Sequence, residues 1–390
     1  MAAAYIVDAV RSAGGRRGGR LAGWHPVDLG AAVLNALVDR TGIDPAAIED
    51  VITGCVSQGG EQSQQVGRQI VLSSKLPESV PAVTIDRQCG SSQQAIQFAA
   101  QAIMSGMQDI VVANGIESMT RVPMGTPASL FAEKGLGTNR SPGIEARYPG
   151  IHWSQFGGAE MIAKKHGFTK DQIDQFGYAS HMKAKAAVEA GRFANEIIAL
   201  EYVNAQGETA IHDTDEGIRF DATLEGIQGV KLLMEGGMIT AATSSQICDG
   251  SSAALVVSER ALKEHNLTPR ARIHTMTVTG GDPVIMLEEP LFATDKALKR
   301  SGLKIGDIDA YEVNEAFAPV PMAWLKHTGA NPEKLNMNGG AIALGHPLGA
   351  SGTKLMATLI NVLEQTGGRY GLQTMCEGGG LANVTIIERV

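Results

Sequence analysis

Cys89-Gly90-Ser91-Ser92 and Gly349-Ala350-Ser351-Gly352 stand 260 positions apart, and this pair of stretches decides the fold assignment. The same offset relates Thr41-Gly42-Ile43 to Ser301-Gly302-Leu303. Each stretch of the first pair opens a segment with helical periodicity, which is followed by a glycine and then by an apolar strand pattern. Self-similarity at one offset, across elements of the same kind, indicates a duplicated unit.

Strand and helix patterns alternate on both sides of this repeat, which predicts an α/β fold with helices covering a sheet. The expected strands cover residues 5–10, 50–55, 82–85, 109–114, 252–258, 308–314, 370–376 and 382–388. The expected helices cover residues 26–40, 91–105, 317–327 and 351–365.

The middle of the chain differs from both ends in composition and periodicity. Residues 119–160 are rich in Pro, Gly, Ser and Thr with little periodicity, 161–192 read as helical, and 201–237 are polar and punctuated by glycine. Long irregular stretches of this kind tend to be functional. We therefore expect an inserted loop domain over 119–245, between an N-terminal half (1–118, completed by 246–270) and a C-terminal half (271–390).

Composition excludes several classes of protein. The 390 residues are 44% hydrophobic, too apolar for a disordered chain, and the net charge of −8 argues against a non-specific nucleic-acid binder. No apolar run reaches the roughly 18 residues of a membrane span, and no secretory signal pattern opens the chain, so we expect a cytoplasmic protein. Four scattered cysteines predict free thiols and no metal site.

Cys89 is the first candidate for chemistry, because it follows an expected strand and stands at the start of an expected helix. Partial positive charge and unpaired N–H groups at a helix start favour a thiolate. The alternative is a cysteine that serves as a small buried apolar side chain.

His346 stands between Gly345 and Pro347, where the proline restricts the backbone and the glycine lets another group approach closely. An imidazole beside a thiol can act as its base. The alternative is a loop histidine without a role.

Two further stretches end expected strands. Cys376-Glu377-Gly378-Gly379-Gly380 leaves backbone N–H groups free for an oxyanion, although a tight turn between two strands would look the same. Asn314-Glu315-Ala316-Phe317 stands where α/β sheets place ligands, and alone it says little.

Together these stretches resemble the thiolase family, and the resemblance runs over essentially the whole chain. Four motifs occur in the family's order and approximate spacing: Asp86-Arg87-Gln88-Cys89-Gly90-Ser91-Ser92, Asn314-Glu315-Ala316-Phe317, Gly345-His346-Pro347 and Cys376-Glu377-Gly378-Gly379-Gly380. The resemblance implies a duplicated five-layered αβαβα core with an inserted loop domain, and an acyltransferase that uses coenzyme A as co-substrate and holds no permanent cofactor.

The resemblance also implies a role for each motif residue. Cys89 would be the acylated nucleophile, His346 its activator, and Cys376 the second acid and base. Asn314 would hold a water that stabilises an enolate with His346. The N–H groups of Cys89 and Gly378 would form a second oxyanion hole.

Four residues match family positions that contact coenzyme A or line its channel. Ser245 would meet the pantetheine arm and Arg219 the adenine end, whereas a turn serine and a solvated arginine are the alternatives. Met286 and Phe317 would line the thioester channel, with plain core packing as the alternative.

Departures from the family pattern bear on the substrate. Asp86 replaces a usual Asn, Ser92 a usual Gly, and Leu381 a frequent Gly; Gln155-Phe156 stands where short-chain biosynthetic members have His-Met. The motif variants over residues 86–92 and 376–380 look more like those of actinobacterial degradative thiolases, some of which act on steroid-derived acyl-CoAs.

The sequence thus predicts a degradative thiolase that cleaves a 3-ketoacyl-CoA to acetyl-CoA or propionyl-CoA. The alternatives are a biosynthetic acetoacetyl-CoA thiolase and a non-catalytic acyl-CoA or sterol binder; a ketoacyl synthase would use histidines in place of Cys376. By the same resemblance, residues 58–68 lie at the interface of a homodimer or homotetramer, with a surface loop as the alternative.

Overall fold

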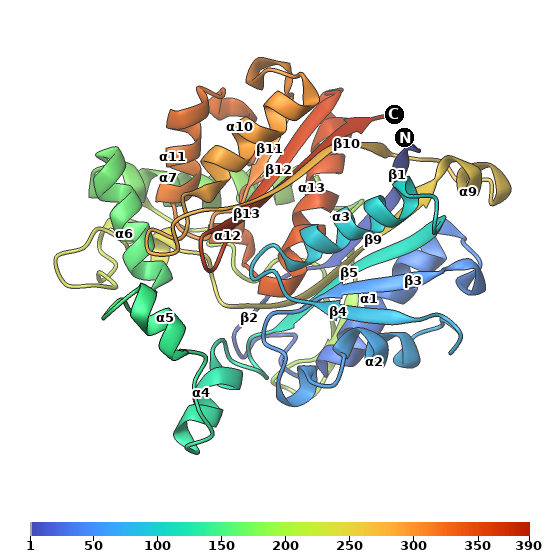
Figure 1. The fold of residues 1–390 in the computed structure, drawn as a ribbon, viewed down its shortest axis with the longest axis horizontal. Coiled ribbons are helices and arrows are strands. Elements are labelled where there is room, and N and C mark those ends of the chain that lie inside the picture. Colours follow the sequence, from blue (N-terminus) through green and yellow to red (C-terminus); the bar gives the residue numbers. More distant parts are fainter. Residues whose placement is uncertain (1) are drawn as a thin grey trace.

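The computed structural model describes residues 2–390, and within that range an 11-stranded mixed sheet runs through the molecule (Figure 1). Its main strands follow the order β11-β12-β13-β10-β1-β9-β5-β3-β4. Their bounds are Ala4–Ser12 (β1), Asp50–Gly54 (β3), Ala82–Ile85 (β4), Ile110–Ser118 (β5), Cys248–Ser258 (β9), Ala271–Gly280 (β10), Ala310–Val313 (β11), Tyr370–Glu377 (β12) and Leu381–Arg389 (β13).

The two halves of this sheet repeat one plan. In the first half β1 pairs antiparallel with β9, β9 antiparallel with β5, and β5 parallel with β3. In the second half β10, β13, β12 and β11 pair in the same sequence of directions. The halves join where β1 meets β10 antiparallel, at Tyr5 and Arg272. The predicted duplication is therefore confirmed.

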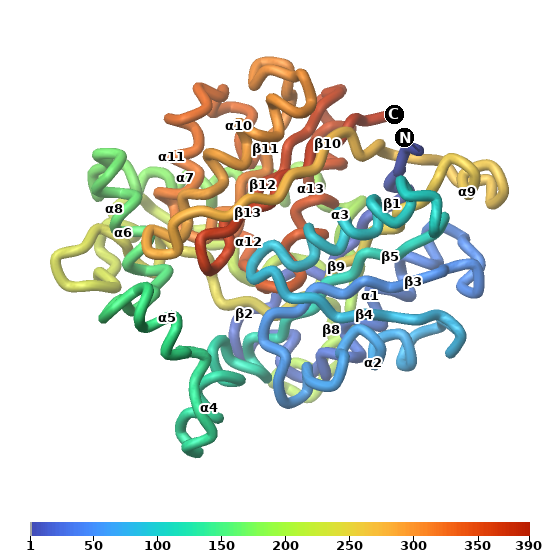
Figure 2. The backbone as a smooth tube through the Cα atoms, in the orientation of Figure 1, coloured from blue at the N-terminus to red at the C-terminus, as the bar shows by residue number. Residues whose placement is uncertain are grey.

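The fold has five layers: outer helices, the first half-sheet, the central helices, the second half-sheet and a second set of outer helices. One apolar cluster lies on the outer side of each half-sheet, and another lies around the central helices. Leu34 of α1 (Pro26–Thr41) packs in a cluster with Leu255 of the first half-sheet, on its outer side. Ile96 of α3 (Ser91–Met104) and Leu359 of α13 (Ser351–Thr366) share the central cluster. Figure 2 shows α3 and α13 at the centre of the molecule.

The outer layers are completed by α2 (Val66–Ser73) on the first half-sheet, and by α10 (Glu289–Ser301) and α11 (Pro319–Thr328) on the second. Leu291 of α10 shares the third apolar cluster with Val384 of β13. The predicted αβαβα core is therefore confirmed, and it places the two repeated helices, α3 and α13, face to face in its middle layer.

The expectation of little regular structure over residues 119–160 is wrong. This stretch contains α4 (Thr126–Glu133) and α5 (Pro142–Arg147), and α6 (Gln155–His166) begins within it. Neither α4 nor α5 has a buried residue, and both lie at the outside of the molecule (Figure 1). A helix that buries no face needs no apolar periodicity, so the pattern that reveals a helix was missing.

The intervening region packs on both halves of the core. Its strand β6 (Ile197–Ile198) pairs with β1, and α6 packs against α11.

The remaining strands and α-helices of the structure are β2 (Gly15–Arg16), α7 (Lys170–Glu189), β7 (Leu200–Val203), β8 (Thr209–His212), α8 (Leu224–Gln228), α9 (Glu259–Glu264) and α12 (Ala341–Leu344). The domain boundaries stay a prediction. Among residues 2–390, no helix has the length and apolar character needed to cross a membrane.

Candidate active site

Cys89 lies in a tight turn between β4 and α3, two residues before the helix begins. The preceding Gln88 has a left-handed backbone with φ 48°, a conformation that non-glycine residues adopt rarely and mostly where surrounding structure enforces it. Its N–H donates to the carboxylate of Asp86 at 2.6 Å, which holds the turn. Cys89 is 9% exposed, so the surrounding protein covers nearly all of the residue.

The repeated helix starts bring the second half of the chain to this turn. Gly352 at the start of α13 touches Gln93 of α3 so closely that a Cβ on Gly352 would lie 1.9 Å from the Gln93 nitrogen. The Thr353 N–H donates to Ser92 Oγ at 3.0 Å. Because only a residue without a side chain permits this approach, the duplicated glycine-rich turns set the site by packing the two helix starts together.

Cys376 reaches the same place through the hairpin of β12 and β13. A Cβ on Gly90 would lie 1.9 Å from Glu377 Oε1, so the backbone of the Cys89 turn lies directly against the residue that follows Cys376. The Asn383 side chain donates to the Gly90 carbonyl at 3.1 Å. The structure therefore brings the two cysteines, 287 positions apart in the chain, into one buried neighbourhood.

His346 is held by contacts at its backbone and at its ring. Its N–H donates to the Gln246 carbonyl at 3.2 Å, and its Nδ1 lies 2.5 Å from Ser351 Oγ. The Ser351 hydroxyl donates its own proton to the Pro347 carbonyl at 2.8 Å, so its oxygen accepts from Nδ1–H. Nε2 is then the unprotonated ring nitrogen, and Asn314 Nδ2 lies 3.4 Å from it.

Asn314 follows β11 directly, and the residue after it is a buried carboxylate. Glu315 accepts from Ser180 Oγ at 2.6 Å, Asn336 Nδ2 at 2.9 Å and the Ile342 N–H at 3.2 Å. These bonds tie the Asn314 turn to α7 and α12. The Oδ1 atom of Asn314 is buried and has no hydrogen-bond partner within residues 2–390.

Burial sets the resting protonation states of the three reactive groups. Burial, with a further contribution from Glu377, raises the pKa of Cys89 to about 12. Burial and the neighbouring Cys89 also raise the pKa of Cys376. Burial, followed by the charge of Lys354, lowers the pKa of His346 to about 3. At neutral pH the site therefore holds two thiols and a neutral imidazole.

The helix start was expected to favour the thiolate form of Cys89, but in this structure burial has the larger effect on its pKa. Partial charges at a helix terminus favour a thiolate by a modest amount, typically about 0.3–1 kcal/mol at exposed sites. Removing an anion from water costs more than that, and here burial is the largest cause of the raised pKa. Cys89 consequently needs a base to become a nucleophile.

A cavity of about 770 Å³ opens at His346, whereas Cys89, Cys376 and Asn314 are not among its lining residues. Of the expected ligand contacts, Arg219, Ser245 and Phe317 line it, together with His346. Cys89 packs in one apolar cluster with residues that line the cavity, Met119 and Leu348.

Met286 lies in the apolar cluster of the second half, 7% exposed and with φ 60°, and is not among the lining residues of this cavity.

Two family models together match nearly the whole chain. The model of the thiolase N-terminal domain matches residues 4–260, and that of the thiolase C-terminal domain matches residues 267–389. The chain belongs to the thiolase family. The predictions of family, fold class and acyltransferase chemistry are therefore confirmed.

Individual thiolases align along the full chain. A steroid 3-ketoacyl-CoA thiolase of Mycobacterium tuberculosis is 53% identical over 392 residues, covering 100% of this chain and 95% of that protein. The 3-ketoacyl-CoA thiolases of Pseudoalteromonas translucida and Idiomarina loihiensis are 42% and 43% identical, and each alignment covers 99% of this chain. These alignments cover 98% and 99% of the two relatives.

Sequence reasoning missed several residues of the thiolase cavity. His181 lines it, accepts the Arg219 N–H on Nδ1 at 3.2 Å, and has a pKa lowered to about 4 by burial and then by Arg219. Nothing local in the helix α7 pattern distinguishes this histidine. Arg16 and Arg17 also line the cavity, and their glycine-rich, basic surroundings could have identified them.

All four cysteines are buried free thiols. No group of three or more His, Cys, Asp or Glu side chains in residues 2–390 is arranged to bind a metal ion.

Proposed function

We propose that this thiolase cleaves a 3-ketoacyl-CoA with coenzyme A through an acyl-Cys89 intermediate, releasing acetyl-CoA or propionyl-CoA and a shortened acyl-CoA. One observation carries the proposal: two protonated thiols, Cys89 and Cys376, lie in one buried neighbourhood, Cys89 packs against the lining residues Met119 and Leu348 of the cavity, and His346 in that lining has an unprotonated Nε2. The degradative reading is favoured over a biosynthetic or non-catalytic protein because the full-length relatives carry 3-ketoacyl-CoA thiolase names.

The first half-reaction uses all three groups. His346 Nε2 takes the proton of Cys89, and the thiolate attacks the 3-keto carbon of the substrate. The bond between C2 and C3 then breaks, and its electron pair stays on C2 as the enolate of the leaving thioester. The Cys376 thiol protonates C2, which leaves the acyl group on Cys89 and a thiolate on Cys376.

The second half-reaction restores the enzyme. The Cys376 thiolate takes the proton of the incoming coenzyme A thiol, and the new thiolate attacks the acyl carbonyl on Cys89. The Cys89 sulfur leaves and recovers its proton from the His346 imidazolium. Each proton and electron pair is thereby returned, in agreement with a ping-pong reaction.

Two groups of donors support the oxygen atoms that become negative. In this proposal the N–H groups of Cys89 and Gly378 support the oxygen of the acyl intermediate. Asn314 beside His346 supports the enolate oxygen through a bound water. Met286 packs behind the channel wall in this proposal, and Phe317 forms the wall itself.

Coenzyme A enters at the basic end of the cavity. Arg16, Arg17 and Arg219 line it there, and three guanidinium groups suit the phosphates and adenine of coenzyme A. Ser245, whose N–H donates to the Ala316 carbonyl at 2.9 Å, stands further along the path of the pantetheine arm.

The acyl group is proposed to be bulky and polycyclic, of the steroid-derived kind. Apolar side chains, among them Met119, Met124 and Phe156, line part of the rest of the cavity beside polar ones such as Gln155 and Gln246, and the cavity volume exceeds what an acetoacetyl group needs. Phe156 packs edge-on against Phe317 with ring centroids 5.5 Å apart, forming an apolar wall at the position where short-chain biosynthetic members have a His-Met pair. The substrate class of the mycobacterial relative supports this choice.

A homodimer or homotetramer in the cytoplasm is also part of the proposal. The strand β4 is the edge of the sheet, and Val83 on it is 37% exposed. Gln64 and Gln65, in the segment expected at the interface, are exposed and both have positive φ. Light scattering coupled to size-exclusion chromatography measures the assembly, and a monomer would contradict it.

The test of the proposed function is a thiolysis assay over acetoacetyl-CoA, a long linear 3-ketoacyl-CoA and a steroid side-chain 3-ketoacyl-CoA. We expect the highest kcat/KM for the steroidal substrate, and an acyl group on the Cys89 peptide by mass spectrometry after acid quench. C89A should lose both turnover and adduct. C55A, which alters another buried free cysteine, should retain the adduct. Turnover by C89A would overturn the proposal.

A further inference from the structure

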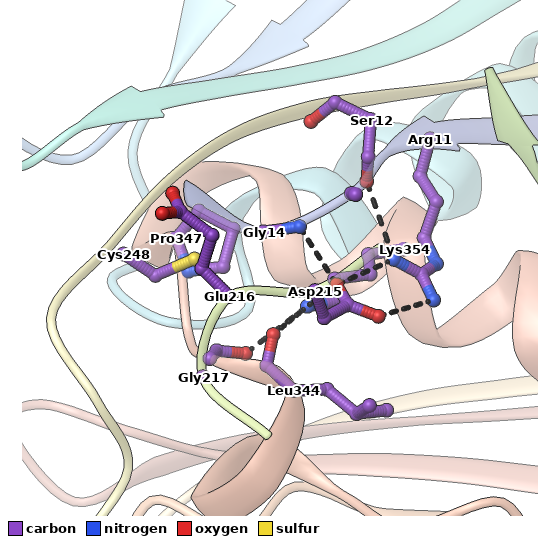
Figure 3. Close-up of polar contacts among 12 residues, drawn as sticks. Arg11, Ser12, Gly14, Asp215, Glu216, Gly217, Cys248, Leu344, Pro347 and Lys354 are labelled. Carbon is purple, nitrogen blue, oxygen red and sulfur yellow. Dashed lines mark hydrogen bonds and ion pairs between the residues drawn. The ribbon is translucent and has the colours of Figure 1, made fainter. Parts of the chain in front are cut away.

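Four charged side chains that the proposed reaction does not use are buried beneath the His346 loop. They are Arg11, Glu196, Asp215 and Lys354, and none of these side chains is more than 4% exposed. Burying a charge is costly unless partners compensate for the lost water. Figure 3 shows Lys354 and Arg11 on either side of Asp215.

Within the cluster, Arg11 satisfies both carboxylates. It donates to Glu196 at 2.8 Å and to the two oxygens of Asp215 at 2.8 and 3.1 Å. Asp215 also accepts the Gly14 N–H at 2.7 Å. Lys354 Nζ lies 3.7 Å from Asp215 Oδ1, which is beyond direct hydrogen-bond distance. The opposite charge of Asp215 therefore stabilises the ammonium group, while its N–H groups donate to other acceptors.

The Lys354 ammonium donates to two backbone carbonyls, Leu344 at 2.5 Å and Gly345 at 3.2 Å. These carbonyls end α12 and lead directly into His346. Gly345 has φ 78°, so the chain leaves the helix there with no intrahelical partner for its last carbonyls. Lys354 replaces those partners, as Figure 3 shows for Leu344.

The same loop is held on its other side by Gln246. The Gln246 carbonyl accepts the His346 N–H, and its Nε2 donates to the Ile342 carbonyl at 2.8 Å. Lys354 stands three positions after Ser351, which binds the His346 ring. One turn of α13 therefore supports both the ring and the backbone that precedes it.

We propose that Lys354 is a positioning residue of this thiolase, whose ammonium fixes the Leu344 and Gly345 peptides so that His346 presents Nε2 to the reacting groups. The inference rests on the proposed role of His346. The charge also favours a neutral ring, since Lys354 is the second cause, after burial, of the low pKa of His346.

The test compares K354M with K334M. Methionine keeps an unbranched side chain one atom shorter than lysine but removes the charge and the donors, and Asp215 keeps its bonds to Arg11 and Gly14. Lys334 offers a matched control because its Nζ donates to the Ile308 carbonyl at 2.8 Å and lies 3.6 Å from Asp309, away from the cavity. We expect K354M to lose about 10–100-fold in kcat, the usual cost of losing a group that orients a functional histidine.

Active sites are counted by the amount of acyl-Cys89 formed in a rapid quench, so that kcat refers to functional sites alone. We expect near wild-type KM for coenzyme A in K354M, and near wild-type kcat in K334M. The acidic limb of kcat against pH should move to higher pH in K354M, because the ring loses a neighbouring positive charge. Asp215, Arg11, Glu196 and Cys248 are the charged or titratable groups around Lys354, and they are unchanged in this variant.

A K354M protein with wild-type kcat per functional site and an unmoved acidic limb would overturn the inference. K354Q, which keeps a donor for the Leu344 carbonyl, is the second variant, and insolubility of both would also overturn it by assigning Lys354 to folding alone. H346Q separates the two proposals. If H346Q remains active, the proposed function is wrong; if H346Q is inactive and K354M is normal, only the role of Lys354 is wrong.

Discussion

His346 Nδ1 lies 2.5 Å from the hydroxyl oxygen of Ser351, five residues further along the chain. The duplication places Ser91 at the equivalent position of the first half, where its hydroxyl donates to the Gln88 carbonyl at 2.6 Å. Both serines thus close a turn by donating to a backbone carbonyl. In the second half that hydroxyl also accepts from a ring, which converts a structural turn into a support for the base.

The S351A variant tests this support. Without the serine oxygen, Nδ1–H loses its acceptor and the other tautomer, protonated on Nε2, becomes accessible. Because that tautomer cannot take the Cys89 proton, we expect kcat to fall by about 10–100-fold, as for other groups that orient a functional histidine. Steady-state thiolysis measures the loss. S301A, which removes a helix serine donating to the Leu298 carbonyl at 3.0 Å, should leave kcat unchanged.

The N314A variant tests oxyanion support. Asn314 contributes only where negative charge develops on the enolate oxygen, so we expect kcat to fall by about 10²–10³, with little change in KM. N338A is the control, because Asn338 is equally buried but contacts Arg192 and Gln365. Equal losses in N314A and N338A would contradict a specific role for Asn314.

The low pKa of His346 predicts a pH-dependent stability. The folded ring has a pKa of about 3, below the ordinary value near 6.5, so below pH 6.5 the unfolded chain binds a proton that the folded chain does not. The free energy of unfolding must therefore fall as the pH falls, by up to about 1.4 kcal/mol per pH unit from this group.

Urea denaturation of the wild type and of H346Q between pH 8.5 and 5 isolates this contribution, since His181, whose pKa is also lowered, is common to both. We expect the free energy of unfolding of H346Q, relative to that of the wild type, to rise as the pH falls below 6.5 and to stay constant between pH 7.5 and 8.5. Parallel curves over the whole range would show that His346 titrates normally.

We expect substitution of Glu117 to lower the free energy of unfolding strongly. Its buried carboxylate accepts the N–H groups of Val56, Ser57 and Gly349, each at 2.9 Å, and so ties the first half to the loop after His346. In E117Q the side-chain NH₂ group would face one of these backbone N–H donors, so that N–H would lose its acceptor. We expect a loss of about 2–5 kcal/mol in the free energy of unfolding. Urea denaturation measures it, and E259Q, on the exposed face of α9, should leave the midpoint unchanged.

Much of the fold could be predicted from the sequence because its elements bury regular apolar faces. The repeat located α3 and α13, which begin at Ser91 and Ser351, and glycines before the following strands marked their ends. The helices α4 and α5 were not predicted, because a segment without a buried face carries no periodic signal. The proposed site residues Cys89, His346 and Cys376 stand at turns, and the glycine and proline around them made those turns recognisable.

The amino-acid sequence alone was enough to predict the α/β class, the duplication and the candidates for the reactive side chains, because strand and helix periodicity and turn chemistry are local properties. Only the tertiary structure decided that Cys89 and Cys376 share a buried neighbourhood, that their thiols are protonated, and that Lys354 and Glu117 hold the loops. Burial and long-range contact change a pKa or pair a charge, and neither quantity exists until the chain has folded.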